Sequence, residues 1–469
     1  MDRSTAAHPW MANSVGTTKA AMLATIGAGS IAELFQQIPA SHRTRAPLDL
    51  PPAIRSEAAL KRHLREIAAQ NGDCETNISF LGGGIWQHHV PAVCDELVRR
   101  QEWLTSVFGS PESDHGRNQA WFEFCSLLGE LIEMDLVGMP VYSWGCAAGH
   151  AIRMAARLTG RSKVIVAGPV SPERMSVIKT YCQSATEGRA IDVAICGADP
   201  ATGLVDLAAL HRLVGANTAA VYFENPSYHG LFETGAAEIA AIARKAGAEI
   251  IVGVDPLTLG VVAPPSAYGA DIVVGSIQPL GVHMHGGGGV GGFIASRHEE
   301  RYAREYPTFL VSIAPTSVPS EHGFGLSLFH QTSYGMRDEG KDWTGNSTYL
   351  WTIAGAAYMA LLGPEGFAEL GRTIIGNAHR AAKRIGAIKG VRIVRPAGFF
   401  KEFLVDFSAT GKSVAAINKA LLGHGIFGGI DLSGEAPSPG QVALYCVTEV
   451  HTEADIDRLA AALETVLAA

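Results

Sequence analysis

The chain has 469 residues, of which 47% are hydrophobic and 17% are charged, and it contains 53 glycines but only 23 prolines. This composition excludes a disordered chain and a collagen-like or low-complexity one, and it predicts a globular protein with a large core. The net charge of −8 argues against a nucleic-acid partner, which needs a basic face. Seven scattered cysteines without a C-x-x-C pair predict reduced thiols in a cytoplasmic protein.

Residues 1–75 are predicted to form an arm without a core of its own. Residues 18–38 suggest two short helices broken at Gly27–Gly29, and the stretch 45–54 is punctuated by proline. Ser56 is placed to cap the helix that follows it. Uninterrupted apolar runs of roughly 18–20 residues are absent from the sequence, so no membrane span is expected.

From residue 76 onward, short β-branched runs alternate with Ala-rich helices, which indicates a mainly parallel sheet with crossover helices and thus an α/β fold. Helices are expected near 91–107 and 117–134. Strands are expected at 163–168, 191–196, 219–225, 249–255 and 270–276. The glycine-rich stretch 286–297 is predicted to turn into an antiparallel strand.

The order of elements changes after a helix over 345–361 that is broken by the glycines and proline of 363–366. Strands and helices then follow an α+β pattern. We therefore predict a large domain over 76–361 and a smaller C-terminal domain over 362–469.

Two glycine runs, Gly82–Gly84 and Gly286–Gly289, allow positive φ and a close approach of the backbone. Tight turns are the commoner cause of such runs. Neither run has the G-x-G-x-x-G spacing between a strand and a helix, and a P-loop is absent from the sequence, so nucleotide binding is not predicted.

Trp144, Gly145 and Cys146 open a predicted helix, whose N-terminal N–H groups could receive a phosphate while Trp144 lies against an aromatic cofactor. A capped helix with a core tryptophan explains the same residues and is the commoner case. Asp255 ends a predicted strand at the edge where open α/β sheets bind ligands, and it equally fits a residue that caps a turn.

A pyridoxal phosphate enzyme needs a lysine for its Schiff base, but the sequence has no lysine from 246 to 340. Gln278 and Pro279 follow the strand where that lysine is wanted. The nucleophile motif G-x-S-x-G and the zinc motif H-E-x-x-H are also missing from the sequence.

Two pairs of histidines are candidates for a metal site. Neighbouring His88 and His89 point to opposite faces of an extended chain, whereas His283 and His285 share a face if that segment is extended. Neither pair has an acidic or cysteine partner at ligand spacing, so packing or substrate binding is the preferred interpretation and no metal is predicted.

Several stretches, in order along the chain, resemble one family. They are NISFLGGGIWQHHVPAV at 77–93, the PES and HG residues of 111–116, ENPSYHGLFE at 224–233, VDPLTLGVVAPPSAYGADIVVGSIQPLG at 254–281, FFKEF at 399–403 and CVTEVHTEADID at 446–457. Over roughly residues 8–469 the chain resembles the α subunits (subunit 1) of two-subunit glycine dehydrogenases (decarboxylating), the P-proteins of the glycine cleavage system.

The resemblance implies a fold type I architecture, the aminotransferase-like fold of pyridoxal phosphate enzymes. In the two-subunit form the Schiff-base lysine lies on the β subunit, and the segment Gln278–Gly281 matches the family's replacement for it. The resemblance therefore implies no catalytic lysine here, a cofactor held covalently by the partner at a shared interface, an α2β2 assembly, and an inactive isolated chain.

The implied reaction releases CO2 from the small amino acid glycine and passes the aminomethyl group to the lipoyl arm of the H-protein. Trp144, Gly145 and Cys146 are expected to line the former phosphate loop, and Asp255 to be the relic of the pyridinium partner. Candidates for the shared pocket or the lipoyl channel are His88, His89, His115 and His283.

Three places depart from the family's usual pattern: the segment 142–147, His115 and the segment 339–346. They border the expected pocket and leave a paralogous decarboxylase subunit for another amino acid as an alternative. A non-catalytic scaffold subunit is the third hypothesis. If this chain did anchor a cofactor itself, Lys341 would be the candidate.

Overall fold

The computed structural model describes residues 7–8, 10–44, 46, 48–103, 111–183, 190–328, 340–341, 348–395, 398–435 and 440–468, without the side chains of 111–116. The chain divides into two compact units, Met1–Gly72 (unit 1) and Asp73–Ala469 (unit 2). None of the helices in these ranges is long and apolar enough to cross a bilayer.

Unit 1 consists of short helices joined by extended chain. Helix α1 covers Gly16–Thr25 and α2 covers Glu57–Ala68. Ser56 caps α2, as predicted, because its hydroxyl accepts a hydrogen bond from the Ala59 N–H at 3.4 Å. Short 3-10 turns lie at Ala12–Ser14, Ile31–Phe35 and Ala40–His42. Every described residue of this unit is at least partly exposed, so these residues form no hydrophobic core.

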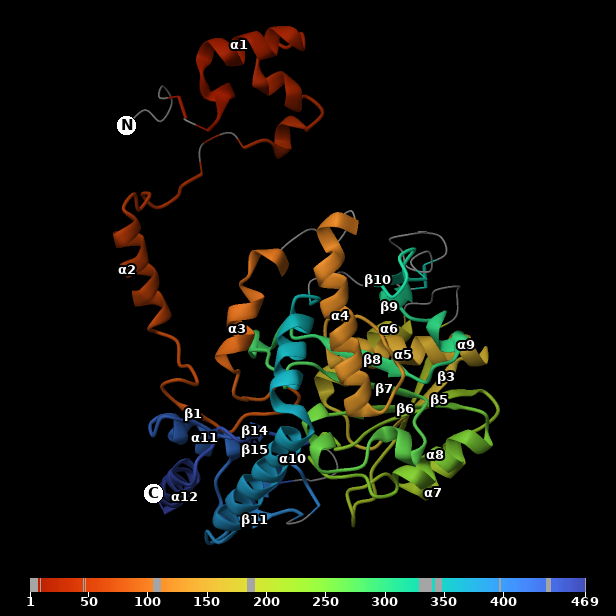
Figure 1. The fold of residues 1–469 in the computed structure, drawn as a ribbon. Helices are drawn as coiled ribbons and strands as arrows, with labels where there is room; N and C mark the ends of the chain where they lie inside the picture. Colours follow the sequence, from red (N-terminus) through yellow and green to blue (C-terminus); the bar gives the residue numbers. More distant parts are fainter. Residues whose placement is uncertain are drawn as a thin grey trace. The chain divides into compact units, whose positions relative to one another are not determined.

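A seven-stranded sheet forms the centre of unit 2, in the order β2-β8-β7-β6-β5-β3-β4. Figure 1 labels its strands β8, β7, β6, β5 and β3. Strands β7, β6, β5, β3 and β4 run parallel to one another, whereas β8 runs antiparallel to both of its neighbours, β7 and β2. The bounds are β2 Leu136–Val137, β3 Lys163–Ala167, β4 Asp192–Cys196, β5 Thr218–Glu224, β6 Glu249–Val254, β7 Ile272–Ser276 and β8 Gly292–Ser296. This arrangement confirms the predicted, mainly parallel sheet with an antiparallel strand after the glycine-rich turn.

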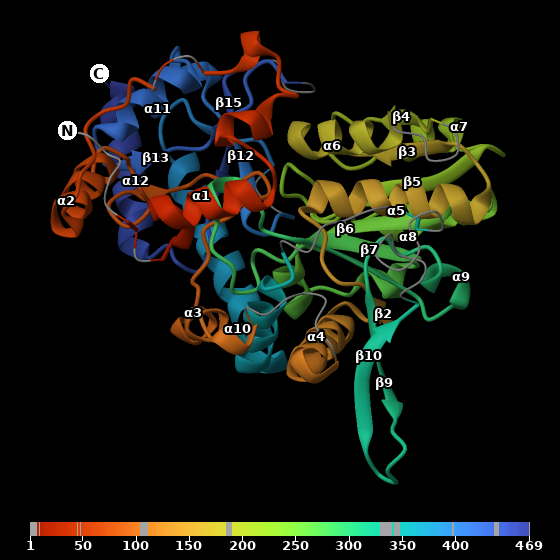
Figure 2. The same cartoon turned by 90° about the horizontal axis from the view of Figure 1, so that it is seen from above.

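Helices cover both faces of this sheet because alternate strand residues point to opposite sides. Val164 and Val166 of β3 pack with α5, whereas Ile165 packs with the cluster that includes α4 and α8. Helix α5 lies across β5, β6 and β7 (Figure 2). The helix bounds are α3 Ala92–Val98, α4 Pro111–Ile132, α5 Trp144–Thr159, α6 Pro172–Gln183, α7 Leu207–Leu213, α8 Ala236–Lys245 and α9 Glu300–Ala303.

A second, antiparallel sheet follows in the order β11-β12-β15-β14. Its bounds are β11 Arg392–Ile393, β12 Glu402–Asp406, β14 Ile430–Asp431 and β15 Val442–Cys446, and its helices are α11 Val414–Leu422 and α12 Glu453–Ala468. Phe403, Val405 and Tyr445 pack here in a core with residues of α10, α11 and α12.

Helix α10, Trp351–Gly386, contributes to the cores of both sheets. It bends at Gly363, whose φ of 58° and ψ of −179° are not helical, so the predicted interruption is confirmed. The predicted domain boundary at 362 lies next to this bend. It stays a prediction, because both sheets belong to one compact unit.

Two smaller strand pairs complete unit 2. Strand β1, Ile78–Ser79, pairs in parallel with β13, Ile426–Phe427, and so joins the start of this unit to its C-terminal sheet region. Strands β9, Leu310–Pro315, and β10, His322–Ser327, form a hairpin that projects from the rest of the unit in Figure 2.

Candidate active site

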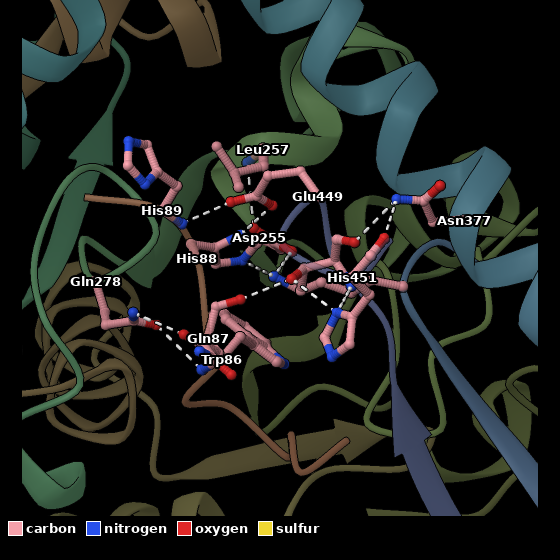
Figure 3. A network of polar contacts seen from close by, with 12 residues as sticks. Trp86, Gln87, His88, His89, Asp255, Leu257, Gln278, Asn377, Glu449 and His451 are labelled. Atoms are coloured by element: carbon pink, nitrogen blue, oxygen red, sulfur yellow. Dashed lines mark hydrogen bonds and ion pairs between the residues drawn. The ribbon is translucent and has the colours of Figure 1, made fainter. Parts of the chain in front are cut away.

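Residues from both sheets of unit 2 meet at the carboxyl end of β6. Asp255 follows β6 directly, Lys401 precedes β12, and Glu449 follows β15. Trp86 and His88 come from the segment after β1 (Figure 3). The fold therefore brings four separate stretches of sequence together at the edge where open α/β sheets bind ligands.

Asp255 caps a turn, as one of its two suggested roles required, and it also pairs with a lysine of this chain. One oxygen, Oδ1, accepts a hydrogen bond from the Leu257 N–H at 3.1 Å and caps the 3-10 turn Pro256–Gly260. The other, Oδ2, lies 2.7 Å from Nζ of Lys401. The two side chains are 4% and 2% exposed, so this is a buried ion pair.

The Lys401 ammonium has three close neighbours. Besides Asp255, its Nζ lies 2.9 Å from Nε2 of His88 and 3.5 Å from the centre of the Trp86 ring. Because an ammonium only donates hydrogen bonds, Nε2 of His88 must be the acceptor, and the ring proton is then on Nδ1. Burial and the charge of Lys401 lower the pKa of His88, which agrees with a neutral ring.

Glu449 completes this chain of contacts. Its Oε2 lies 2.8 Å from Nδ1 of His88, and its Oε1 accepts the His89 N–H at 2.7 Å. Burial alone would raise the pKa of Glu449, but the His88 ring and the His89 N–H outweigh it and lower the pKa to about 2. Thr448 donates to the Gln87 carbonyl at 2.7 Å, so the backbone of 87–89 is held from the end of β15 (Figure 3).

Gln278, just after β7, ties the same segment to the large sheet. Its side-chain NH2 donates to the carbonyls of Trp86 and Val282 at 2.9 and 3.2 Å, and its carbonyl accepts the Trp86 N–H at 3.1 Å. The side chain is thus fully engaged and offers no amine for a Schiff base.

A second buried ion pair lies beside Trp144. Arg174 donates from Nε and Nη2 to the two oxygens of Glu224 at 2.8 and 2.7 Å. Its guanidinium carbon lies 4.4 Å from the centre of the Trp144 ring, and Tyr222 donates to Glu224 at 2.8 Å. The flat face of Trp144 that was considered for a cofactor is therefore next to a guanidinium.

The helix start at Trp144 is capped within the chain. Ser143 accepts the Cys146 N–H at 3.3 Å. A Cβ on Gly145 would come within 3.0 Å of Cβ of Val177 in α6, so packing against α6 is a sufficient reason for this glycine. The predicted phosphate role of Trp144, Gly145 and Cys146 stays a prediction.

Trp86, Trp144, Arg174, Asp255 and Lys401 line a cavity of about 20 Å³. Such a volume holds about one water molecule, whereas pockets for drug-sized ligands measure several hundred Å³. Among the described residues, the chain's own side chains therefore fill this part of the ligand edge.

The predicted histidines are distributed over different environments. His88 is buried in the network, while the neighbouring His89 is exposed and held through its N–H. The exposed His283 contacts Asp95, with Nε2 2.9 Å from Oδ1. His115 belongs to α4, but its side chain is outside the described part.

The segment 339–346 also falls mostly outside the described residues. Lys341 is described, and its Nζ lies 3.8 Å from Oε1 of Glu305. Within the described ranges, three or more His, Cys, Asp or Glu side chains do not come together in a way that could hold a metal ion.

Sequence reasoning missed Lys401. The signal was present in Phe399–Phe403, where a lysine and a glutamate interrupt an apolar strand that has to be buried. Charged side chains in such a strand need partners inside the protein. The partner, Asp255, could not be named without the fold.

The family model described as glycine cleavage system P-protein matches residues 12–463. This chain belongs to the glycine cleavage system P-protein family. Its relatives include proteins named probable glycine dehydrogenase (decarboxylating) subunit 1. The one from Staphylothermus marinus is 33% identical, with 98% of each chain covered. The one from Brevibacillus brevis is 35% identical, with 96% of this chain and 97% of the relative covered.

Solved structures confirm the fold type I prediction for this P-protein family member. An inhibitor-bound glycine decarboxylase (P-protein) of the glycine cleavage system matches with a TM-score of 0.86 at 33% identity, covering 98% of this chain and all of the other. An alanine–glyoxylate aminotransferase from Nostoc sp. matches with a TM-score of 0.55 at 16% identity, covering 91% of this chain and 98% of the other, and shows the fold alone.

Pyridoxal phosphate, the cofactor typical of fold type I, does not fit the cavity of this P-protein chain. Asp255, which would face a cationic ring nitrogen, already pairs with Lys401. The cavity holds about one water, and Gln278 stands where the anchoring lysine is expected.

Proposed function

We propose that this chain is the non-Schiff-base subunit of a pyridoxal phosphate-dependent glycine decarboxylase. The complete enzyme releases CO2 from glycine and passes the aminomethyl group to the lipoyl H-protein. Identities of 33–35% with relatives named as subunit 1 support this proposal along nearly the whole chain. The observation that carries the subunit assignment is Gln278, because its engaged amide replaces an anchoring amine at the end of β7.

The proposal places the anchoring lysine and the cofactor on a second subunit, in an α2β2 assembly with a shared site. When bound there, the cofactor supplies an electron sink for the carbanion left by CO2 loss. The present chain would contribute shape and polar groups to that site. Its seven cysteines are all free, which supports the proposed cytoplasmic location.

The loop from His283 to Gly289 is the part of this chain that we propose to face the shared site. Gly286, Gly287 and Gly289 have positive φ values of 63°, 89° and 64°. A Cβ on any glycine from 286 to 289 would meet no described atom within 4 Å. The loop therefore has an open side, where a partner's backbone or a ligand could approach closely.

The test is glycine–CO2 exchange with labelled bicarbonate in the presence of H-protein. The isolated chain should show no exchange, the second subunit alone little, and the mixture full activity. Full activity from this chain alone contradicts the proposal. Exchange by the mixture with another amino acid but not with glycine would support the paralogous decarboxylase instead.

Reduction with borohydride locates the cofactor separately from activity. After reduction of the mixed complex, mass spectrometry should find the pyridoxyl group on a lysine of the second subunit. Finding it on Lys341 or Lys401 would contradict the assignment of this chain as the subunit without a Schiff base.

A further inference from the structure

We propose that Lys401 is an internal counter-ion that takes the place of a ligand cation opposite Asp255 and that positions the segment 86–89 through His88 and Glu449. The inference concerns this chain's own side chains and does not depend on the proposed reaction. It assigns a role to a lysine that belongs to no catalytic motif. It also predicts a cation site that opens when the lysine side chain is removed.

The first argument is the environment of Asp255. Its side chain is 4% exposed, and an isolated carboxylate at such a position costs several kcal/mol unless a cation compensates it. Among the described residues, Lys401 is the cation in contact with it, at 2.7 Å. The Leu257 N–H binds the other oxygen, so this ammonium is the charge that compensates the carboxylate.

The second argument is that close neighbours enclose the ammonium. It lies 2.7 Å from Oδ2 of Asp255 as an ion pair, donates a hydrogen bond to Nε2 of His88 at 2.9 Å, and lies 3.5 Å from the centre of the Trp86 ring. An amine held as a charged ion pair is a poor nucleophile. Lys401 thus occupies a structural position and is not available to form a Schiff base with an aldehyde cofactor.

The third argument is continuity with the backbone of 86–89. His88 contacts Lys401 with one ring nitrogen and Glu449 with the other, and Glu449 also accepts the His89 N–H. Gln278 holds both polar backbone groups of Trp86. Removing Lys401 should therefore loosen one end of this segment while Gln278 still holds the other.

The experiment is chemical rescue of Lys401→Ala in the full chain, followed by thermal unfolding. We expect the variant to lose about 5 °C in Tm, because it leaves a buried carboxylate unpaired. Propylammonium at tens of millimolar should recover at least half of this loss, whereas 1-propanol should not. Wild type should not respond to propylammonium, since its site is filled.

The matched control is Lys412→Ala, which removes an ammonium that donates to the Val466 carbonyl at 2.8 Å. Its stability should not depend on propylammonium. Equal rescue of Lys401→Ala by propanol would mean that the lysine acts by apolar packing. An unchanged Tm for Lys401→Ala would mean that Asp255 needs no counter-ion. Either result overturns the proposal.

A second set of variants covers the case in which Lys401→Ala does not fold. Lys401→Met combined with Asp255→Asn removes both charges, and should unfold within about 2 °C of wild type although Lys401→Met alone is clearly less stable. The contact from Lys401 through His88 to Glu449 has its own measurement. In Lys401→Met the pKa of His88, followed by NMR and assigned with His88→Gln, should rise. An unchanged pKa would mean that Lys401 does not act on His88, which would contradict the positioning role.

Discussion

Arg174 and Glu224 form a two-pronged ion pair that is almost completely removed from solvent, with side chains 5% and 0% exposed. The pair connects α6 to the end of β5, and Tyr222 adds a third hydrogen bond. Breaking a buried pair is costly because the remaining charge has no water to compensate it.

Replacing Glu224→Gln should therefore lower the free energy of unfolding by about 3–5 kcal/mol, measured by urea denaturation. The double variant Glu224→Gln with Arg174→Met should lose less than the sum of the single changes. The control is Glu299→Gln, which removes an exposed partner of Arg301 and should cost below about 1 kcal/mol. Equal costs for the two single glutamate variants would contradict this ranking.

The lowered pKa values of three histidines predict how the stability of the protein depends on pH. Burial and nearby cations lower the pKa of His88 and, to about 4, that of His229, and burial lowers that of His451. The unfolded chain then binds more protons than the folded one below pH ~6.5, so stability present above this pH is lost as the pH falls towards 4.

Thermal unfolding between pH 7.5 and 4.5 checks this expectation. His229→Gln should flatten the fall in stability by up to about 2 kcal/mol, since one unit of pKa corresponds to about 1.4 kcal/mol and the ring is partly exposed. His424→Gln, at an exposed position, should leave the slope unchanged. A slope that both variants share with wild type would argue against His229 as a contributor.

A substitution at Gly288 should disturb assembly with the second subunit but not the folding of the isolated chain. It has an ordinary φ of −116°, and a Cβ there meets no described atom within 4 Å, so Gly288→Leu should leave the Tm of the isolated chain unchanged. The added side chain fills the open side of the loop. We expect at least a tenfold loss of exchange activity with the second subunit.

The control for this change is Gly215→Leu, which also meets open space at an exposed position. It should keep full activity. A Gly288→Leu enzyme with normal activity would mean that the loop does not face the shared site.

The sequence alone could place Asp255 and Gln278, because Asp255 ends one predicted strand, Gln278 follows another by two positions, and strand ends define the ligand edge. It could not reveal that Lys401 closes that edge. That pairing depends on how β12 is brought to β6, and long-range register leaves no local pattern in the residues.

At the scale of elements, α5 and α6 pack closely because α5 presents glycines to its neighbour. A Cβ on Gly149 would lie 2.6 Å from Cγ of Tyr181 and 2.8 Å from its Cβ. The Cβ cannot move without shifting the helix. The two helices are therefore held at a distance that only a glycine allows.

We predict that Gly149→Ala costs about 1–3 kcal/mol in unfolding free energy through overpacking. Gly376→Ala in α10 is the matched change, because this glycine is exposed and a Cβ there meets open space. It should stabilise the chain by about 0.5–1 kcal/mol. Urea denaturation of both variants checks the opposite signs, and a shared sign would contradict the packing argument.

One strand and one helical stretch show what the sequence could and could not predict. The apolar run that predicted a strand over 249–255 became β6 at Glu249–Val254, because a run of that length and composition fits a buried parallel strand. The helical stretch expected near 91–107 is divided in the described residues up to 103. The structure has α3 ending at Val98 and a 3-10 turn at Gln101–Trp103, where the Arg100 N–H bonds to Leu97 three residues back. Such local tightening has no clear sequence signal.

At the scale of the whole molecule, unit 1 differs from unit 2 in having no buried residue among those described. Trp10 is 89% exposed, and Leu48 and Leu50 are 71% and 67% exposed. With its large apolar side chains this exposed, the segment buries too little apolar surface to offset its conformational entropy.

A fragment of residues 1–72 should therefore show no cooperative thermal transition by circular dichroism, although Ser56 favours a fraying helix α2. The full chain should show a cooperative transition from unit 2. A sharp transition in the fragment would mean that unit 1 has a core that its residue exposures do not show.

The pairing of β1 with β13 and of His88 with Glu449 has a consequence for synthesis in the cell. His88 and Glu449 are 361 positions apart. A ribosome that adds about 5–20 residues each second needs roughly 20–70 s to cover that distance. During most of this interval Phe80 and Trp86, which are buried in the finished protein, lack late partners such as Tyr445 and Lys401. The emerging chain is thus a candidate client for chaperones until its last strand has left the ribosome.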